Sequence, residues 1–101
     1  MLVVHATFPI DPDRREEALE AATTLAEHSR VEDGIIDYRV AIDADDPNLL
    51  RFFEQYEDEA AFGAHSETEH FGEFAAVLPE LLAGEPDVVR FDVSEATELE
   101  L

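Results

Sequence analysis

The chain has 101 residues, of which 26 are acidic and six are basic, so its formal net charge at pH 7 is -20. This length suits a single domain, residues 1–101, with a two-layer core, and it is too short for a two-domain enzyme. The charge would repel nucleic acid, and the absence of cysteine excludes disulfides, a thiolate nucleophile and cysteine-ligated metal.

The first part of the chain is expected to form a strand, a helix and a second strand. Residues 2–8 alternate between apolar and polar side chains, which is typical of a strand. After a break bounded by prolines at 9–12, capping residues and an apolar stripe of helical period predict a helix that reaches about Arg30. The expected apolar row of the second strand is Ile36, Tyr38, Val40 and Ile42.

A hairpin is expected to lead from the second strand into a third. The sequence DADDPN at 43–48 is dense in turn formers. One face of the third strand is predicted to carry Leu50, Phe52, Glu54 and Tyr56. One carboxyl group, that of Glu54, therefore falls in an otherwise apolar row.

A short helix is expected to follow the third strand. Asp58 can cap it, and the helix would end at His65, beside the strand. A polar break at 66–69 then leads to His70 and Phe71, which are expected to open another helix. The two histidines would thus lie on either side of a helix–helix corner.

The last part of the chain is expected to form this second helix and a fourth strand. The apolar residues at helical spacing are Phe71, Phe74, Ala75, Leu78 and Leu82. Pro79 is expected to kink or restart the helix. Val89, Phe91 and Val93 alternate as a strand, and residues 95–101 form an acidic tail.

The elements occur in the order strand, helix, strand, strand, helix, strand. This order predicts an α+β fold of the ferredoxin-like split βαβ type, with a four-stranded antiparallel sheet and the helices on one face. The other face would carry Val3, Leu49 and Phe53, which a second copy could cover. We therefore expect a homodimer with face-to-face sheets, although the sequence leaves open which face forms the dimer and which the pocket.

No local motif points to a bound metal or cofactor. His65 and His70 are five residues apart, which on a continuous helix would place them on different faces. Neither an HExxH sequence nor a local spacing of two histidines and one carboxylate occurs, and there is no phosphate-binding glycine loop or nucleophilic serine motif. We expect no metal site and no cofactor.

The remaining candidate is a small apolar pocket between the sheet and the helices. Its polar groups would be Glu54, Tyr56, Tyr38 and His65. Burial should raise the pKa of Glu54 toward neutrality, so that Glu54 and His65 together could remove a proton from an acidic substrate. Structural roles stay open beside this one, because a buried glutamate often accepts a hydrogen bond and a histidine at a helix end often caps carbonyl groups.

Four segments spread over most of the chain carry a resemblance to a known family. They read HATFPIDPDRREE, DGIIDYRV, NLLRFFEQYEDEAAFGAHSETEHF and LPELLAGEP. The chain resembles the antibiotic biosynthesis monooxygenase superfamily, small dimeric α+β barrels that include quinol monooxygenases. The most specific part falls on Glu54, Tyr56, His65, His70 and Phe71. Many relatives have Trp at position 56 and Pro at position 69, where this chain has Tyr and Glu.

The resemblance implies oxygenation without metal or flavin. A phenol or quinol is deprotonated, its anion passes an electron to dioxygen, and the two radicals combine inside a dry pocket. It also implies that His65, assisted by Glu54, transfers the proton. The residues implied in holding a flat aromatic substrate are Tyr38, Tyr56, Phe62, His70, Phe71 and Phe74.

Other functions of the same scaffold stay open. One is a non-catalytic ligand-binding or stress-response dimer, and another is an isomerase of the autoinducer-2-processing type. Such an isomerase would need cations for its phosphosugar, for which Arg39, Arg51 and Arg90 are available. Haem degradation is disfavoured, because haem-degrading relatives have an axial histidine where this chain has Ala75.

The acidic residues are spread through segments with clear apolar periodicity. In molar salt the Debye length falls to about 3 Å, so self-repulsion is largely screened. The composition therefore indicates a protein from a halophilic microbe. No segment approaches membrane-spanning length, and the first residues alternate as a strand, so a cytoplasmic protein is expected.

Overall fold

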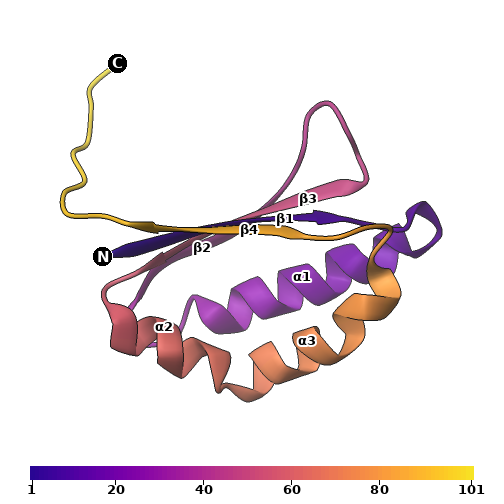
Figure 1. Cartoon of the computed structure of the whole chain (residues 1–101), viewed down its shortest axis with the longest axis horizontal. Helices are drawn as coiled ribbons and strands as arrows, with labels where there is room; N and C mark the ends of the chain where they lie inside the picture. Colours follow the sequence, from indigo (N-terminus) through magenta and orange to yellow (C-terminus); the bar gives the residue numbers. More distant parts are fainter.

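Four antiparallel strands form one sheet in the computed structural model, which describes residues 1–101, and the helices lie together on one face of that sheet (Figure 1). The strands, in the sheet order β2-β3-β1-β4, are β1 (Leu2–Pro9), β2 (Ile35–Ile42), β3 (Leu49–Tyr56) and β4 (Asp87–Asp92). The helices are α1 (Arg15–Ser29), α2 (Glu59–Ser66) and α3 (Glu69–Leu81), with a 3₁₀ turn at Pro12–Arg14. The predicted ferredoxin-like α+β fold is confirmed.

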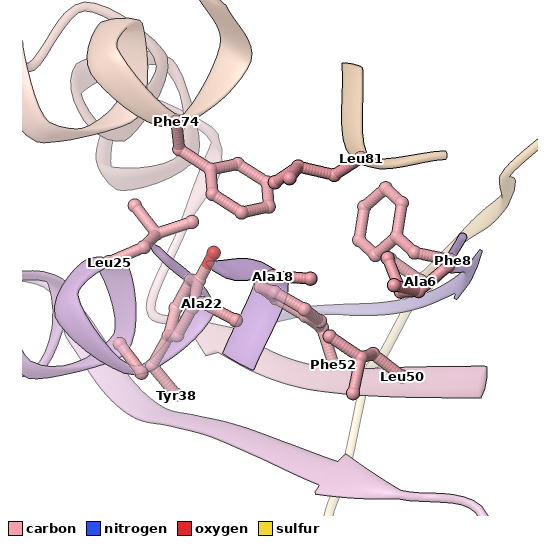
Figure 2. Packing of buried hydrophobic residues seen from close by; sticks show 12 residues of the cluster. Ala6, Phe8, Ala18, Ala22, Leu25, Tyr38, Leu50, Phe52, Phe74 and Leu81 are labelled. Carbon is pink, nitrogen blue, oxygen red and sulfur yellow. The ribbon is translucent and has the colours of Figure 1, made fainter. Parts of the chain in front are cut away.

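The hydrophobic core lies between the inner face of the sheet and helices α1 and α3 (Figure 2). Every second residue of β1 and β3 is buried, as the alternation in their sequences predicted. Phe8 and Phe52, from these two strands, meet edge to face with ring centroids 5.0 Å apart, and Phe74 of α3 lies 6.1 Å from Phe8. Burial of each such side chain contributes about 1.5–3 kcal/mol, so this layer fixes α1 and α3 over the sheet.

Side-chain caps define the corner between α2 and α3. The Asp58 carboxylate accepts a hydrogen bond from the backbone N–H of Ala61 at 2.9 Å, at the predicted start of α2. Thr68 accepts from the N–H of Phe71 at 3.2 Å and donates its hydroxyl hydrogen to the carbonyl of His65 at 2.8 Å. One threonine side chain therefore joins the last turn of α2 to the first turn of α3.

Some details of the elements differ from the predictions. Helix α3 runs through Pro79 to Leu81 without restarting, although Pro79 has no N–H for the hydrogen bond to the carbonyl four residues back. Leu81 is buried, whereas Ala75, predicted on the apolar side, is exposed. In β2 the register shifts next to Ile35, so Ile35 packs against the core and Ile36, predicted in the apolar row, is 49% exposed.

No helix covers the outer face of the sheet. On this face Val3 lies opposite Phe91, and His5 lies opposite Phe53. Phe53 is 41% exposed and Phe91 is 50% exposed, so the single chain presents large apolar side chains to solvent here. The helices cover the face that carries Glu54, so Glu54 lies on the side of the sheet where the pocket was expected.

The acidic side chains lie almost entirely outside the core. Of the 26 acidic residues, only Glu54 is buried. Adaptation to concentrated salt stays a prediction. None of the helices combines the length and the apolar character that crossing a membrane requires.

Candidate functional site

His65 lies in the last turn of α2 and is buried, with 2% of its surface exposed. Because the cap sets the phase of this short helix, His65 faces inward together with Ala61, one turn earlier. The imidazole ring centroid lies 5.3 Å from that of Tyr38 and 5.7 Å from that of Tyr56. Phe71 meets it nearly edge to face at 5.2 Å. The structure thus brings together four of the residues that the sequence proposed.

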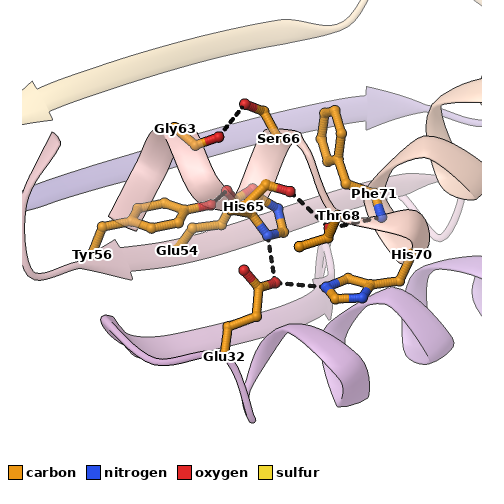
Figure 3. A network of polar contacts seen from close by, with 9 residues as sticks. All are labelled: Glu32, Glu54, Tyr56, Gly63, His65, Ser66, Thr68, His70 and Phe71. Carbon is orange, nitrogen blue, oxygen red and sulfur yellow. Dashed lines mark hydrogen bonds and ion pairs between the residues drawn. The ribbon is translucent and has the colours of Figure 1, made fainter. Parts of the chain in front are cut away.

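A carboxylate that the sequence did not single out holds this histidine. Oε2 of Glu32 accepts hydrogen bonds from Nδ1 of His65 at 2.8 Å and from Nε2 of His70 at 2.6 Å (Figure 3). Glu32 lies in the loop between α1 and β2, 33 positions before His65. Gly34 in this loop has a φ of 87°, and its carbonyl accepts from the N–H of Glu57 at 2.8 Å. This turn brings the loop against the start of α2.

The bond to Glu32 decides which nitrogen of His65 carries the proton. An ionised carboxylate only accepts, so Nδ1 of a neutral His65 is the N–H nitrogen and Nε2 keeps its lone pair. Nε2 is buried and has no hydrogen-bond partner. An unpaired buried polar atom costs about 1–3 kcal/mol. Nε2 of His65 is therefore a candidate for contact with a bound ligand.

Glu54 bonds to a tyrosine, and no hydrogen bond joins it to His65. Its Oε1 accepts the hydroxyl hydrogen of Tyr56 at 2.6 Å. Burial raises the pKa of Glu54 to about 7, against the opposite effect of hydrogen bonds from Tyr56 and Tyr38. Burial, and then the charge of Glu54, raises the pKa of both tyrosine hydroxyls. Both tyrosines therefore stay protonated donors, and the ring of each also packs against His65.

The aromatic residues predicted to hold a substrate fall in two places. Phe62 is half-buried and lies edge-on to Tyr56 at 5.2 Å, and Phe71 is half-buried beside His65. Phe74 instead belongs to the hydrophobic core. Phe62 and Phe71 therefore lie beside the group of Tyr56 and His65, whereas Phe74 packs elsewhere in the core.

A groove of about 360 Å³ lies between α1 and α3. Its lining combines apolar side chains such as Phe74 with acidic ones such as Glu73. His70 lines this groove, whereas His65 and Glu54 do not. His70 consequently connects the buried cluster around Glu32 with the surface of the molecule.

Glu32, His65 and His70 form a group that could hold a metal ion, because one potential ligand atom from each lies within 4.8 Å of the other two. Local spacing predicted no set of two histidines and one carboxylate. The reason is that its members come from a loop and two separate helices, which meet only in the folded chain.

The antiparallel sheet with helices on one face defines a small α+β protein of the ferredoxin-like class. Its candidate site is a buried histidine that a carboxylate holds at a helix–helix corner. A family model described as antibiotic biosynthesis monooxygenase matches residues 1–77. The chain belongs to this family, as its sequence motifs predicted.

Known proteins match nearly the whole chain. The Bacillus subtilis (strain 168) protein named "Putative monooxygenase YcnE" is 40% identical over 95 residues, which cover 94% of this chain and 100% of that protein. A crystal structure of an antibiotic biosynthesis monooxygenase has a TM-score of 0.87 at 29% identity, and covers 94% of this chain and 100% of its own. The structure of PA3566 from Pseudomonas aeruginosa has a TM-score of 0.83 at 30% identity, over 89% and 90% of the two chains.

Proposed function

We propose that this protein is a cofactor-independent monooxygenase that acts on a small aromatic phenol or quinol and uses His65 as its base. The observation that carries the proposal is the buried, unpartnered Nε2 of His65, whose lone pair is fixed by the bond from Nδ1 to Glu32. Family membership supports the class of reaction. The aromatic rings packed around the imidazole support a flat aromatic substrate.

The proposed reaction starts at the nitrogen that has no protein partner. Nε2 of His65 takes the hydroxyl proton of the substrate, and Glu32 stabilises the resulting imidazolium through the N–H at Nδ1. The substrate anion gives one electron to dioxygen, and the phenoxyl radical and superoxide combine to form a carbon–oxygen bond. The peroxide takes the proton back from His65 and then loses water together with the ring hydrogen, which leaves one oxygen atom on a quinone.

The groups around His65 would orient the substrate and exclude water. Glu54 accepts the hydroxyl hydrogen of Tyr56 and so fixes the ring of Tyr56 beside His65. Phe62 and Phe71 are the half-buried rings of this group. A substrate would reach Nε2 when these two rings move aside, and its own ring would then replace part of their packing. In this proposal Glu32, instead of Glu54, assists the base.

We also propose that two copies pair through the outer faces of their sheets. The support is the exposed apolar surface that Phe53, Val89 and Phe91 form there, which a two-fold pair would bury. Phe53→Glu should convert dimer to monomer in sedimentation velocity experiments. The matched control is Val77→Glu, which changes an exposed apolar residue of α3 on the opposite side of the molecule. A wild-type protein that sediments as a monomer would contradict the proposal.

The isomerase alternative has less support. Binding a phosphosugar would require a cation that is free to meet the phosphate. The three arginines considered for this role all form ion pairs. These pairs, with N–O distances of 2.7–2.9 Å, are Arg39–Asp37, Arg51–Asp43 and Arg90–Glu59.

Oxygen consumption tests the proposed activity. The purified protein, in about 1 M KCl with a chelator present, is mixed with a panel of hydroquinones and phenols. The wild type should consume oxygen, and His65→Gln should lower kcat by about 10²- to 10⁴-fold. His28→Gln, which removes an exposed histidine, is the control and should leave the rate unchanged.

Two results would reject the monooxygenase proposal. One is an unchanged rate in His65→Gln, and the other is wild-type activity that is present without the chelator and completely lost with it. Binding of quinols without turnover would favour the ligand-binding alternative.

A further inference from the structure

The cluster around Glu32 has the composition of a metal site. It offers two imidazole nitrogens and one carboxylate oxygen, from the loop after α1, the last turn of α2 and the first turn of α3 (Figure 3). Two histidines with one carboxylate are a common ligand set for divalent first-row transition metals. All three ligand atoms lie within 4.8 Å of one another.

We propose that Glu32, His65 and His70 bind one divalent transition-metal ion, and that this ion competes with the proton on Nδ1 of His65. Ligands held about 2.1 Å from a tetrahedral ion lie about 3.4 Å from one another. The present distances from Glu32 Oε2 to the two nitrogens are 2.8 Å and 2.6 Å. A small outward shift of the Glu32 side chain, which stands on a loop, would therefore open room for an ion.

The site can be reached from solvent. The His70 side chain is 19% exposed and that of Glu32 is 13% exposed, so an ion need not cross the core. His70 also lines the groove between α1 and α3, together with the acidic Glu73. Negative charge around such an opening raises the local concentration of cations. Three protein ligands would leave at least one position on the ion for water.

Binding of the ion has a direct consequence for the imidazole of His65. An ion on Nδ1 takes the place of the proton that Glu32 now accepts, so a neutral ring must carry its proton on Nε2. The lone pair on Nε2 is then lost. This consequence for activity rests on the proposed function, whereas the binding of the ion does not.

Titration calorimetry with Zn²⁺ and absorption spectroscopy with Co²⁺ test the binding itself, with no substrate present. In about 1 M KCl, exposed carboxylates bind cations weakly because their charge is screened, while coordination bonds persist. The wild type should bind one ion per chain. Glu32→Gln and His70→Ala should each weaken binding by at least about 100-fold. His28→Ala, which changes a neighbouring histidine, should bind as tightly as the wild type.

Three results would overturn the metal site: no binding by the wild type, equal binding by all variants, or loss of binding in His28→Ala. Circular dichroism establishes that each variant is folded. Nitrogen-15 NMR of the imidazoles tests the competition, because Zn²⁺ should move the His65 proton from Nδ1 to Nε2.

The activity measurement separates this proposal from the proposed function. Zn²⁺ should inhibit oxygen consumption by the wild type, and a chelator should restore it. Tight binding of Zn²⁺ without inhibition would leave the metal site standing and overturn His65 as the base. If the protein consumed oxygen in the presence of a chelator but bound no Zn²⁺, the metal site would be overturned and the proposed activity would stand.

Discussion

Two carboxyl groups flank His65, and they differ in almost every respect. Glu54 stands in the middle of a strand, is 8% exposed and bonds to a tyrosine hydroxyl. Glu32 stands on a loop, is partly exposed and bonds to two imidazoles. The sheet fixes the position of Glu54, and burial raises the pKa of its carboxyl group. Glu32 is positioned by a tight turn, and its carboxylate sets the tautomer of His65. The comparison teaches that the residue that orients a buried histidine need not stand in the most regular element.

The largest expected effect is a difference in kcat between variants of the two carboxyl groups. Glu32→Gln should lower kcat for quinol oxidation by about 10²- to 10⁴-fold, because the amide no longer fixes the Nδ1 proton or stabilises the imidazolium of His65. Glu54→Gln keeps an acceptor for Tyr56 and should lower kcat by less than about 10-fold. Steady-state oxygen consumption in the presence of a chelator measures both. A larger loss in Glu54→Gln would show that the sequence-based pair of Glu54 and His65 is the working one.

The next effect concerns the turn at Gly34, which positions Glu32. Gly34 has a φ of 87°, and an added Cβ would lie 2.6 Å from Cβ of Ala61 in α2. Gly34→Ala should therefore destabilise the protein by about 3 kcal/mol or more, because left-handed backbone and overpacking each contribute. It should also separate Glu32 from His65 while leaving Glu54 in place. Chemical denaturation measures the first effect, and the NMR tautomer signal of His65 measures the second.

Gly63→Ala is the matched control for this substitution. Gly63 lies in α2 and an added Cβ there would meet nothing within 4 Å. The change should stabilise the protein by about 0.4–1 kcal/mol. If Gly34→Ala were as stable as the wild type, the tight approach of the loop to α2 would be wrong.

The third effect concerns pH and isolates Glu54. Its pKa is about 7 in the folded chain and about 4.5 for the free side chain, so folding strengthens proton binding. The resulting stability is fully present below about pH 4.5 and is lost as the pH rises through about 7, a difference of about 3 kcal/mol. In Glu54→Gln this part of the pH dependence should vanish. Denaturation of both proteins at about pH 5 and about pH 8 measures how much the free energy of unfolding of each changes with pH.

If the free energy of unfolding changed equally with pH in the wild type and in Glu54→Gln, a raised pKa of Glu54 would be contradicted. Because the other acidic residues are the same in both proteins, the comparison cancels their contribution to the pH dependence of stability.

The sequence predicted the regular parts of this site and missed the irregular ones. Alternation in β3 placed Glu54 and Tyr56 on the buried face, and a capping signal placed His65 at the end of α2. No periodicity covers Glu32, which depends on the turn at Gly34 and on a partner 33 positions away. Contacts of this kind arise from tertiary packing and leave no local pattern.

Packing density explains another difference between prediction and structure. The family resemblance implied that Phe74 holds a substrate, but Phe74 completes the core with Phe8 and Phe52. Spacing places such rings on one face of a helix and says nothing about whether they meet other rings or an empty space.

The smallest effect tests whether the capped start of α2 helps to hold His65 in its hydrogen bond with Glu32. Asp58→Ala removes the cap that accepts from the N–H of Ala61, and it should cost about 1 kcal/mol of stability. Because His65 lies at the other end of the same two-turn helix, fraying should also weaken its bond to Glu32, seen as faster exchange of the Nδ1 proton. Asp11→Ala is the control, since Asp11 caps the separate turn at Pro12–Arg14 through the N–H of Asp13. It should leave the exchange of the Nδ1 proton unchanged. Equal exchange in both variants would mean that Glu32 and Thr68 hold His65 without help from the start of its helix.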